Sequence, residues 1–363
     1  MSQTVLKKEE NVSRALRSLY RSHGYLPYKM SKFEPYDLYA SHKDFLVGDG
    51  VITFMDTDGR LLALKPDVTL SIIKNSKDGE SQKVYYNENV YRISGETKQF
   101  KEIAQVGLEC LGDIGNYETY ETLYLAAASL QEISQNFVLD ISHLGILSAV
   151  MQSIDKGEDF YAQVMSCLAE KNAHGLLSVC NAYGVEDTAA QKLLTLLRAY
   201  GNPETVLKTL APLCKDGKAK QAFDELSAIC TLLANTPFAG RIRLDFSVVN
   251  DRKYYNGIVF KGFVEGVPEG VLSGGRYDRL MKRLGKQSGA IGFAVYLHLL
   301  EGLNPKREAF DVDTLVLYDE STCLQTLSKQ AQSLQEKGVS FRIAKNGDGI
   351  RYVNALDLRG NKE

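Results

Sequence analysis

The chain has 363 residues, of which 44% are apolar and 24% charged, and its formal net charge is −2. This length can bury a large core in two or three domains, and the near-neutral charge argues against a protein that binds nucleic acid mainly through phosphates. The first residues lack the apolar segment of a secretion signal and no stretch approaches the roughly 20 apolar residues of a membrane span, so we expect a cytoplasmic protein without membrane contact.

Residues 5–22 begin the chain with apolar side chains at helical spacing, which predicts an amphipathic helix. Two strand-like segments follow at 51–56 and 61–65. The Asp58-Gly59 pair between them is typical of a tight hairpin turn. Antiparallel pairing is therefore expected in this part of the chain.

A second hairpin is predicted from strands at 84–92 and 102–111, which a polar stretch separates. Residues 121–135 return to helical spacing, and residues 150–235 are rich in leucine, with few β-branched runs. Strict alternation of apolar and polar residues over 241–248 then predicts a further strand. The chain is thus expected to be α+β.

Near the C-terminus the pattern predicts a βαβ unit, with strands at 314–318 and 339–343 around a helix at 324–334. Together these patterns divide the chain into three parts. They are a mixed core at 1–149 and 236–305, a helical insertion at 150–235, and a truncated α/β tail at 306–363.

The predicted strand at 102–111 carries a polar row. Because side chains alternate along a strand, Gln105, Gly107 and Glu109 share one face. A solvent-exposed sheet face is the more common explanation of such a row. A binding site is the other, since Gly107 leaves a gap between two polar side chains.

Two other segments favour a binding site. Asp67 and Thr69 follow Pro66 at the end of a predicted strand, where a carboxylate and a hydroxyl lie close together in sequence. Gly274 and Gly275 are either an ordinary turn or a stretch of backbone that a ligand can approach closely.

Six short motifs, taken in order, resemble the core of class II histidyl-tRNA synthetases from about residue 8 to residue 303. They are Pro66-Asp67-x-Thr69, Tyr91-Arg92, Gln105-x-Gly107-x-Glu109, Tyr254-Tyr255-x-Gly257, Gly274-Gly275-Arg276-Tyr277-Asp278 and Gly292-Phe293-Ala294. The resemblance implies an antiparallel sheet flanked by helices, a helical insertion, and a short C-terminal βαβ segment that matches only the first half of the family's anticodon-binding domain.

The resemblance also implies a pocket for a histidine-like ligand. Its residues are Asp67, Thr69, Arg92, Gln105, Glu109, Tyr254, Tyr255, Gly274 and Gly275. Asp67 and Thr69 correspond to the site of the amino group, Gln105 to the carboxyl region, and Glu109 with the two tyrosines to the imidazole. A carboxylate suits an ammonium group because charge-assisted hydrogen bonds are strong. The family usually has glutamate at the position of Asp67.

Two catalytic positions depart from the family. Asn250 stands in place of the arginine that stabilises charge during adenylate formation, and Leu299 in place of the ATP-binding arginine. The stretch from Gly292 to Leu300, GFAVYLHLL, corresponds to the family pattern Gly-Phe-Ala-Ile-Gly-Leu-Glu-Arg-Leu. If each lost contact costs about 10² to 10³ in rate, the two together remove roughly 10⁴ to 10⁶. We therefore predict no catalytic residue and no aminoacylation.

Loss of the ATP site with retention of an amino-acid pocket resembles the regulatory subunits that histidine biosynthesis attaches to a short ATP phosphoribosyltransferase. The resemblance implies a non-catalytic subunit, required for the first step of that pathway, whose partners are the short-form catalytic subunit, a second copy of itself, and L-histidine as inhibitory effector. No cofactor and no tRNA binding are expected. The alternatives are an active histidine-tRNA ligase and a tRNA-sensing pseudo-synthetase module.

No metal site is expected either. His143 and His298 have no second ligand at metal-binding spacing, and we predict that they are structural or surface residues. A solvated helix face is the favoured interpretation of a set of basic residues at helical spacing. These are Arg276, Arg279, Lys282, Arg283 and Lys286.

Overall fold

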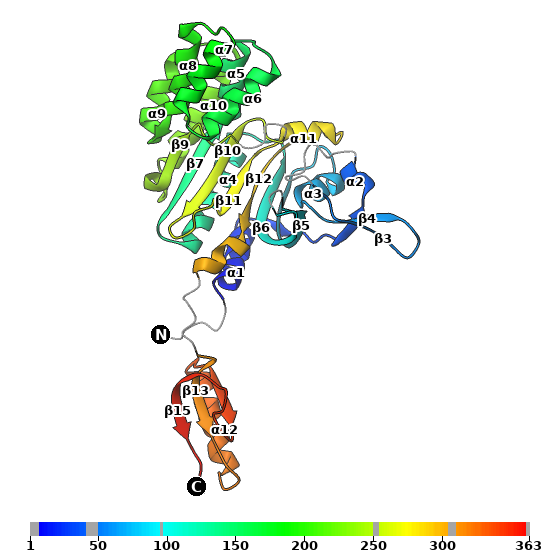
Figure 1. Ribbon diagram of the computed structural model, residues 1–363, viewed down its shortest axis with the longest axis vertical. Helices are drawn as coiled ribbons and strands as arrows, with labels where there is room; N and C mark the ends of the chain where they lie inside the picture. Colours follow the sequence, from blue (N-terminus) through cyan, green and yellow to red (C-terminus); the bar gives the residue numbers. More distant parts are fainter. Residues whose placement is uncertain (1–6, 41–49, 95–96, 250–253, 304–309, 361–363) are drawn as a thin grey trace. The chain divides into compact units, whose positions relative to one another are not determined.

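The computed structural model describes residues 7–40, 50–94, 97–249, 254–303 and 310–360. The chain forms two compact units (Figure 1). One is Val12–Leu300, and the other is built from Met1–Asn11 and Glu301–Glu363.

In the larger unit, nine strands of the described residues form one sheet. In spatial order they are β1 (Leu26–Pro27), β5 (Gln82–Ile93), β6 (Phe100–Gly112), β12 (Gly289–Tyr296), β11 (Leu272–Arg276), β10 (Ile258–Val264), β7 (Phe137–His143), β9 (Ile242–Asp245) and β8 (Tyr200–Gly201). Their neighbours are antiparallel except at β1–β5 and β7–β9. The predicted second hairpin, β5–β6, is therefore confirmed.

Helices α1 (Lys8–Ser22) and α4 (Asn116–Ile133) cover one face of this sheet (Figure 1). The Tyr20 ring of α1 meets Phe293 of β12 edge-on at 5.9 Å, and its hydroxyl is hydrogen-bonded to Ser129 of α4 at 2.9 Å. A side chain at Gly262 of β10 would collide with Leu130 of α4, so this glycine lets the helix pack closely. The opposite face of the sheet is left for the site described below.

A small three-stranded sheet and two short helices lie beside β5 and β6, and a third short helix contacts β12. They are β2 (Phe33–Pro35), β4 (Leu61–Leu64), β3 (Thr53–Met55), α2 (Asp37–Ala40), α3 (Thr69–Asn75) and α11 (Asp278–Arg283). Gly59 has φ +78° in the turn between β3 and β4, which confirms the predicted hairpin. Side chains other than glycine rarely adopt this conformation.

Residues 144–241 are mostly helical, as predicted for the insertion, with the two-residue strand β8 in their midst. The helices are α5 (Leu144–Gln152), α6 (Glu158–Ala169), α7 (Ala173–Ala182), α8 (Asp187–Arg198), α9 (Pro203–Leu210), η2 (Ala211–Leu213), α10 (Gly217–Leu233) and η3 (Ala239–Arg241). Helix α10 packs on α4 and α5. The exact division of the chain at 149/150 and 235/236 stays a prediction.

The second unit contains β13 (Val312–Leu317), α12 (Leu324–Glu336) and β14 (Phe341–Ala344), the predicted βαβ arrangement with parallel strands. A third parallel strand, β15 (Tyr352–Asp357), pairs with the other side of β13 and was not predicted. η4 (Leu297–Leu303) follows β12. Among the described residues, no helix is long and apolar enough to cross a membrane.

Two local expectations were wrong. The strand predicted over 241–248 ends at Asp245, because the carboxylate of Asp245 accepts hydrogen bonds from the backbone and hydroxyl of Ser247 and the chain turns there. The basic residues do not share one helix face, since α11 has only six residues. Arg276 lies in β11, and Lys286 donates its ammonium to the backbone carbonyl of Ser76 at 2.5 Å.

Candidate functional site

A pocket lies on the sheet face opposite α1 and α4, with a cavity volume of about 50 Å³. It is lined by Asp67, Val68, Thr69, Tyr86, Arg92, Gln105, Glu109, Tyr254, Tyr255, Ser273, Tyr277, Gly292, Phe293, Ala294 and Tyr296. Seven of the nine predicted pocket residues are in this set. The other two, Gly274 and Gly275, are not. Motifs more than 200 residues apart in sequence thus meet at one place.

Strand register explains why the polar row of β6 faces the pocket. Gln105, Gly107 and Glu109 lie directly opposite Tyr296, Ala294 and Gly292 of β12. Gln105 is 4% exposed and Glu109 2% exposed, so the interpretation of this row as a solvent-exposed sheet face is wrong. The row was predicted correctly as a face, but only the covering elements decide that it is buried.

Glu109 is the buried acid at the centre of the pocket. Its Oε1 accepts a hydrogen bond from the Thr69 hydroxyl at 2.7 Å, and its Oε2 accepts one from the Tyr277 hydroxyl at 2.5 Å. Burial raises the pKa of Glu109 to about 8, although the two hydroxyl donors act in the opposite direction. A side chain at Gly292 would overlap Oε2, so the carboxylate needs glycine at that position.

Asp67 lies just before α3, and Arg92 of β5 reaches it. The Leu70 backbone N–H donates to Oδ1 of Asp67 at 2.9 Å, and Arg92 donates through Nε to the Pro66 carbonyl at 2.8 Å. The Arg92 guanidinium is 3.8 Å from Oδ2 of Asp67. Burial raises the pKa of Asp67, and Arg92 opposes that shift. The pocket therefore contains two acids and one base, and the acids can accept hydrogen bonds from a cationic group of a ligand.

Aromatic rings form the walls. The Tyr254 ring lies 4.7 Å from that of Tyr255 and 5.7 Å from that of Tyr277, centroid to centroid. Tyr86 and Tyr296 complete the set. Burial raises the pKa of all five phenols, so they act as neutral hydrogen-bonding groups and as faces for a cation.

Three of these tyrosines were missed by the motif comparison. Tyr277 was within a quoted motif, two residues after Gly275. Tyr296 was visible as a tyrosine where the family pattern has glycine. Tyr86 gave no signal in the motifs, because only its pairing with Gly107 of β6 brings it to the pocket.

The two predicted glycines have separate roles. A side chain at Gly275 would lie 2.7 Å from the Tyr255 ring, so this glycine lets Tyr255 pack on the pocket side of β11. A side chain at Gly274 would lie 2.6 Å from the Phe260 ring, on the opposite face of the strand. Gly274 therefore serves sheet packing and does not line the pocket.

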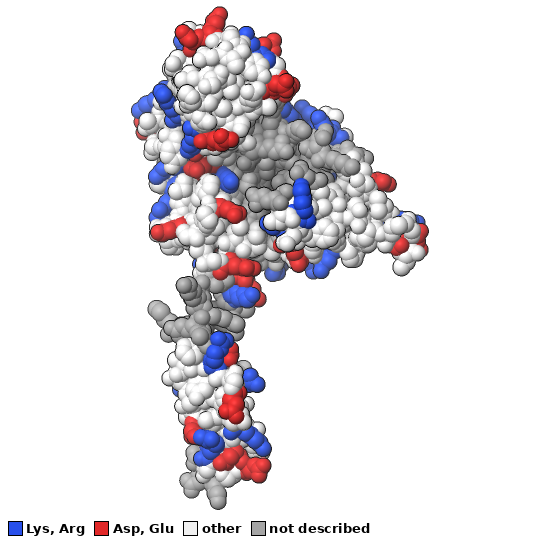
Figure 2. Space-filling view, viewed as in Figure 1, with Lys and Arg blue, Asp and Glu red and all other residues white. Residues whose placement is uncertain are grey.

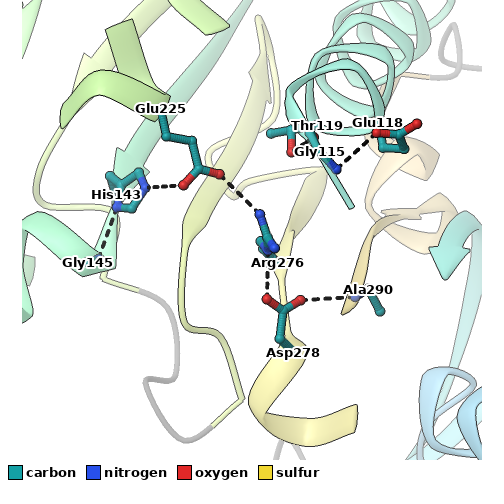
Figure 3. A network of polar contacts seen from close by, with 9 residues as sticks. All are labelled: Gly115, Glu118, Thr119, His143, Gly145, Glu225, Arg276, Asp278 and Ala290. Carbon is teal, nitrogen blue, oxygen red and sulfur yellow. Dashed lines mark hydrogen bonds and ion pairs between the residues drawn. The ribbon is translucent and has the colours of Figure 1, made fainter. Parts of the chain in front are cut away.

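A polar network connects the pocket strands to the helical segment (Figure 3). The Arg276 guanidinium donates to Glu225 of α10 at 3.3 Å and to Asp278 at 2.8 Å. The Gly145 N–H donates to Nδ1 of His143, so Nε2 of the neutral ring carries the proton and donates to Glu225 at 3.3 Å. We call these four side chains, Arg276, Glu225, His143 and Asp278, the Arg276 network.

The network has an electrostatic consequence for Glu225. Burial acts to raise the pKa of Glu225, but the contacts from His143 and Arg276 outweigh it, and the pKa is lowered. Arg276 stands between Gly275 and Tyr277 in the chain, so the network holds the segment from which Tyr277 reaches Glu109. His143 is thus a structural residue, as predicted.

The structure describes one of the two positions at which we predict that a catalytic residue has been lost. Leu299 lies in η4 and is half-buried. Asn250 lies outside the described residues.

His298 has its ring 6.2 Å from that of Tyr296. Within the described ranges, no group of three or more His, Cys, Asp or Glu side chains could hold a metal ion.

Surface charge is mixed on the visible face of the molecule. In Figure 2, basic and acidic side chains of the described residues alternate in small groups over both units. They do not gather there into one extended basic patch of the kind that a nucleic-acid backbone attracts.

The chain matches the histidyl-tRNA synthetase family model over residues 2–300. It is 26% identical to the ATP phosphoribosyltransferase regulatory subunit of Oceanobacillus iheyensis, covering 98% of this chain and 89% of that protein. It is 25% identical to the protein of the same name from Acetivibrio thermocellus, covering 99% of this chain and 89% of that one.

Solved structures agree on the fold. An ATP phosphoribosyltransferase regulatory subunit/histidyl-tRNA synthetase from Bacillus halodurans has a TM-score of 0.79 at 21% identity, covering 98% of this chain and 94% of that one. The histidyl-tRNA synthetase of Nostoc has a TM-score of 0.73 at 18% identity, covering 93% and 82%. A chain of the Thermotoga maritima ATP phosphoribosyl transferase (HisG:HisZ) complex has a TM-score of 0.63 at 18% identity, covering 80% and 97%. The predicted class II synthetase-like α+β fold is confirmed.

Proposed function

This chain belongs to the histidyl-tRNA synthetase family, and from that premise we propose that it is the regulatory subunit of ATP phosphoribosyltransferase. It acts with a separate catalytic subunit in the first step of histidine biosynthesis. The observation that carries this proposal is its similarity, over nearly its whole length, to several proteins with this name. The likeness to a chain of the Thermotoga maritima complex supports the same partner.

The pocket is the proposed site of the effector, L-histidine. Asp67 faces the ammonium group, Arg92 and Gln105 the carboxylate, and Glu109 the imidazole, whose ring stacks between the tyrosines. This assignment places each charged group of the ligand against a complementary group.

The size of the pocket suggests how histidine regulates. A cavity of about 50 Å³ has room for a few water molecules, since each needs roughly 10–15 Å³. Histidine is larger, so its entry separates the side chains that now close the pocket. A ligand that binds an opened state more tightly shifts the protein toward that state.

Loss of aminoacylation is part of the proposal. Leu299 offers no charge to a triphosphate, and Asn250 replaces a second arginine of the family. Measurement of histidine-dependent exchange between ATP and pyrophosphate tests this. We expect no exchange above background, and robust exchange would identify the chain as an active histidine-tRNA ligase instead.

The decisive experiment mixes the chain with a short-form ATP phosphoribosyltransferase and follows phosphoribosyl-ATP formation. We expect the mixture to be active where the catalytic subunit alone is not, and histidine to inhibit it. Glu109→Gln should keep activation and weaken inhibition, with the exposed Glu132→Gln as control. Absence of activation on mixing would overturn the proposed function.

Dimer formation through the synthetase-like core and a cytoplasmic location complete the proposal. The motif 1 proline of the family's dimer interface is Ser31 here, so the dimer is inferred from the family fold. Sedimentation of the isolated chain tests it, and a monomer at micromolar concentration would contradict it.

A further inference from the structure

Tyr296 forms one end of the pocket. It is the last residue of β12, and it lies on the same side of that strand as Gly292 and Ala294. Side-chain size therefore increases along the pocket side of β12, from Gly292 without a side chain, to the methyl group of Ala294, to the phenol ring of Tyr296. On β6, side-chain size also increases between the last two of these positions, since Gly107 lies opposite Ala294 and Gln105 lies opposite Tyr296.

The phenol is held in place from several directions. Its hydroxyl is hydrogen-bonded to the Ser273 side chain, and its ring contacts His298 edge-on at 6.2 Å between centroids. The Tyr296 backbone N–H donates to the Val271 carbonyl at 2.8 Å. A ring fixed in this way acts as a wall, because moving it breaks both packing and hydrogen bonds.

The surroundings of Tyr296 are suited to an anion. Arg92 lines the same pocket as Tyr296, and Gln105 lies directly opposite Tyr296 across the strand pair. The acid Glu109 lies at the other end of the same row, opposite Gly292. The row therefore has hydrogen-bond donors at the Tyr296 end, where Arg92 also lies 3.8 Å from Asp67, and the Glu109 carboxylate at the other end.

We propose that Tyr296 closes the donor end of the pocket and restricts it to amino acids with a free α-carboxylate. The carboxylate of a free amino acid contacts the phenol, Arg92 and Gln105. An adenylate or another extended acyl derivative would have to displace the Tyr296 ring. This inference rests on the proposed histidine pocket and adds a specificity-determining residue to it. Tyr296 thereby limits the site to sensing free amino acid.

Calorimetry with two ligands and three proteins tests the proposal. The ligands are L-histidine and a non-hydrolysable histidyl-sulfamoyl-adenosine, and the proteins are the full wild-type chain, Tyr296→Ala and Tyr296→Phe. We expect wild type to bind the adenosine compound roughly 100-fold more weakly than histidine, the cost of displacing a packed side chain. Tyr296→Ala should reduce that ratio at least tenfold, whereas Tyr296→Phe should preserve it.

Each other outcome has a separate meaning. Equal binding of both ligands by wild type, or an unchanged ratio in Tyr296→Ala, overturns the role of Tyr296. If wild type binds the adenosine compound but not histidine, both this role and the proposed histidine pocket fail. If it binds neither, the histidine pocket and the role of Tyr296 in it are both refuted, and activation of the catalytic subunit remains as a separate test of the proposed function. Tyr296→Val, which keeps a side chain favourable in strands, replaces Tyr296→Ala if that variant does not fold.

Discussion

Glu109 sets the chemistry of the site at the scale of single residues. It is fully enclosed, accepts two hydroxyl hydrogen bonds, and has its pKa raised by burial to about 8. Free histidine carries an imidazole with a pKa of about 6.5. Between these two values, the ligand and Glu109 together hold one proton, which they can share in one charge-assisted hydrogen bond.

Histidine affinity should therefore depend on pH with a maximum between about 6.5 and 8. Below this window both groups are protonated, so binding requires loss of a proton and weakens as the pH falls. Above it both are deprotonated, so binding requires uptake of a proton and weakens as the pH rises. Calorimetric titrations across this range check the profile.

Glu109→Gln is the control for this profile. It removes the titrating carboxyl group and leaves the ligand's own amine and imidazole unchanged. The part of the alkaline decline due to Glu109 should disappear in the variant. Identical alkaline profiles for the two proteins would remove Glu109 from the binding site.

The same group makes stability depend on pH. Its pKa rises from the ordinary value of 4.5 to about 8 on folding, so the folded state holds more protons than the unfolded state between these values. The free energy of unfolding should then fall as the pH rises through that range and level off above it. Urea unfolding of wild type should show this slope, and Glu109→Gln should lessen it, whereas Glu132→Gln should retain it.

At the scale of elements, register and loop contacts assemble the pocket. The hairpin β5–β6 was readable from its alternation and its polar turn, and the hydrophobic pattern indicated which residues share a face. The pairing of β6 with β12, about 180 residues later, was not readable, because no local pattern specifies a distant partner strand. Tyr296 reaches the site only through this distant pairing, whereas Tyr86 reaches it through the pairing of β5 with β6.

The Arg276 network connects α10 to β11, and we predict that it positions Tyr277. Arg276 and Glu225 are 22% and 24% exposed in their side chains, so their ion pair is only partly screened. Glu225→Gln should weaken histidine binding about fivefold, corresponding to roughly 1 kcal/mol, with the chain still folded.

A double-mutant cycle separates positioning from general destabilisation. If Glu225 acts through the Tyr277 hydroxyl, the effect of Glu225→Gln on histidine affinity should largely vanish in a Tyr277→Phe background. Urea unfolding of the same four proteins provides the stability comparison. Additive effects on affinity would show that the network does not act through Tyr277.

At the scale of the whole molecule, the pocket belongs entirely to the unit Val12–Leu300. The strands β13, β14 and β15 pair only with one another among the described residues. A chain ending at Leu303 should therefore fold and bind histidine with the affinity of the full chain. Calorimetry checks this, and loss of binding would show that the C-terminal unit contributes to the site.

The sequence by itself determined the α+β class, the two hairpins, the helical character of the insertion and most of the pocket residues. These follow from local periodicity, turn chemistry and short motifs, each of which is complete within a few neighbouring residues. Only the tertiary structure decided that the polar row of β6 is buried, that Gly274 faces away from the pocket, and that Tyr296 lines it. The reason is physical: burial, and with it the pKa of Glu109, depends on which distant strands and helices cover a residue, and that is a property of packing.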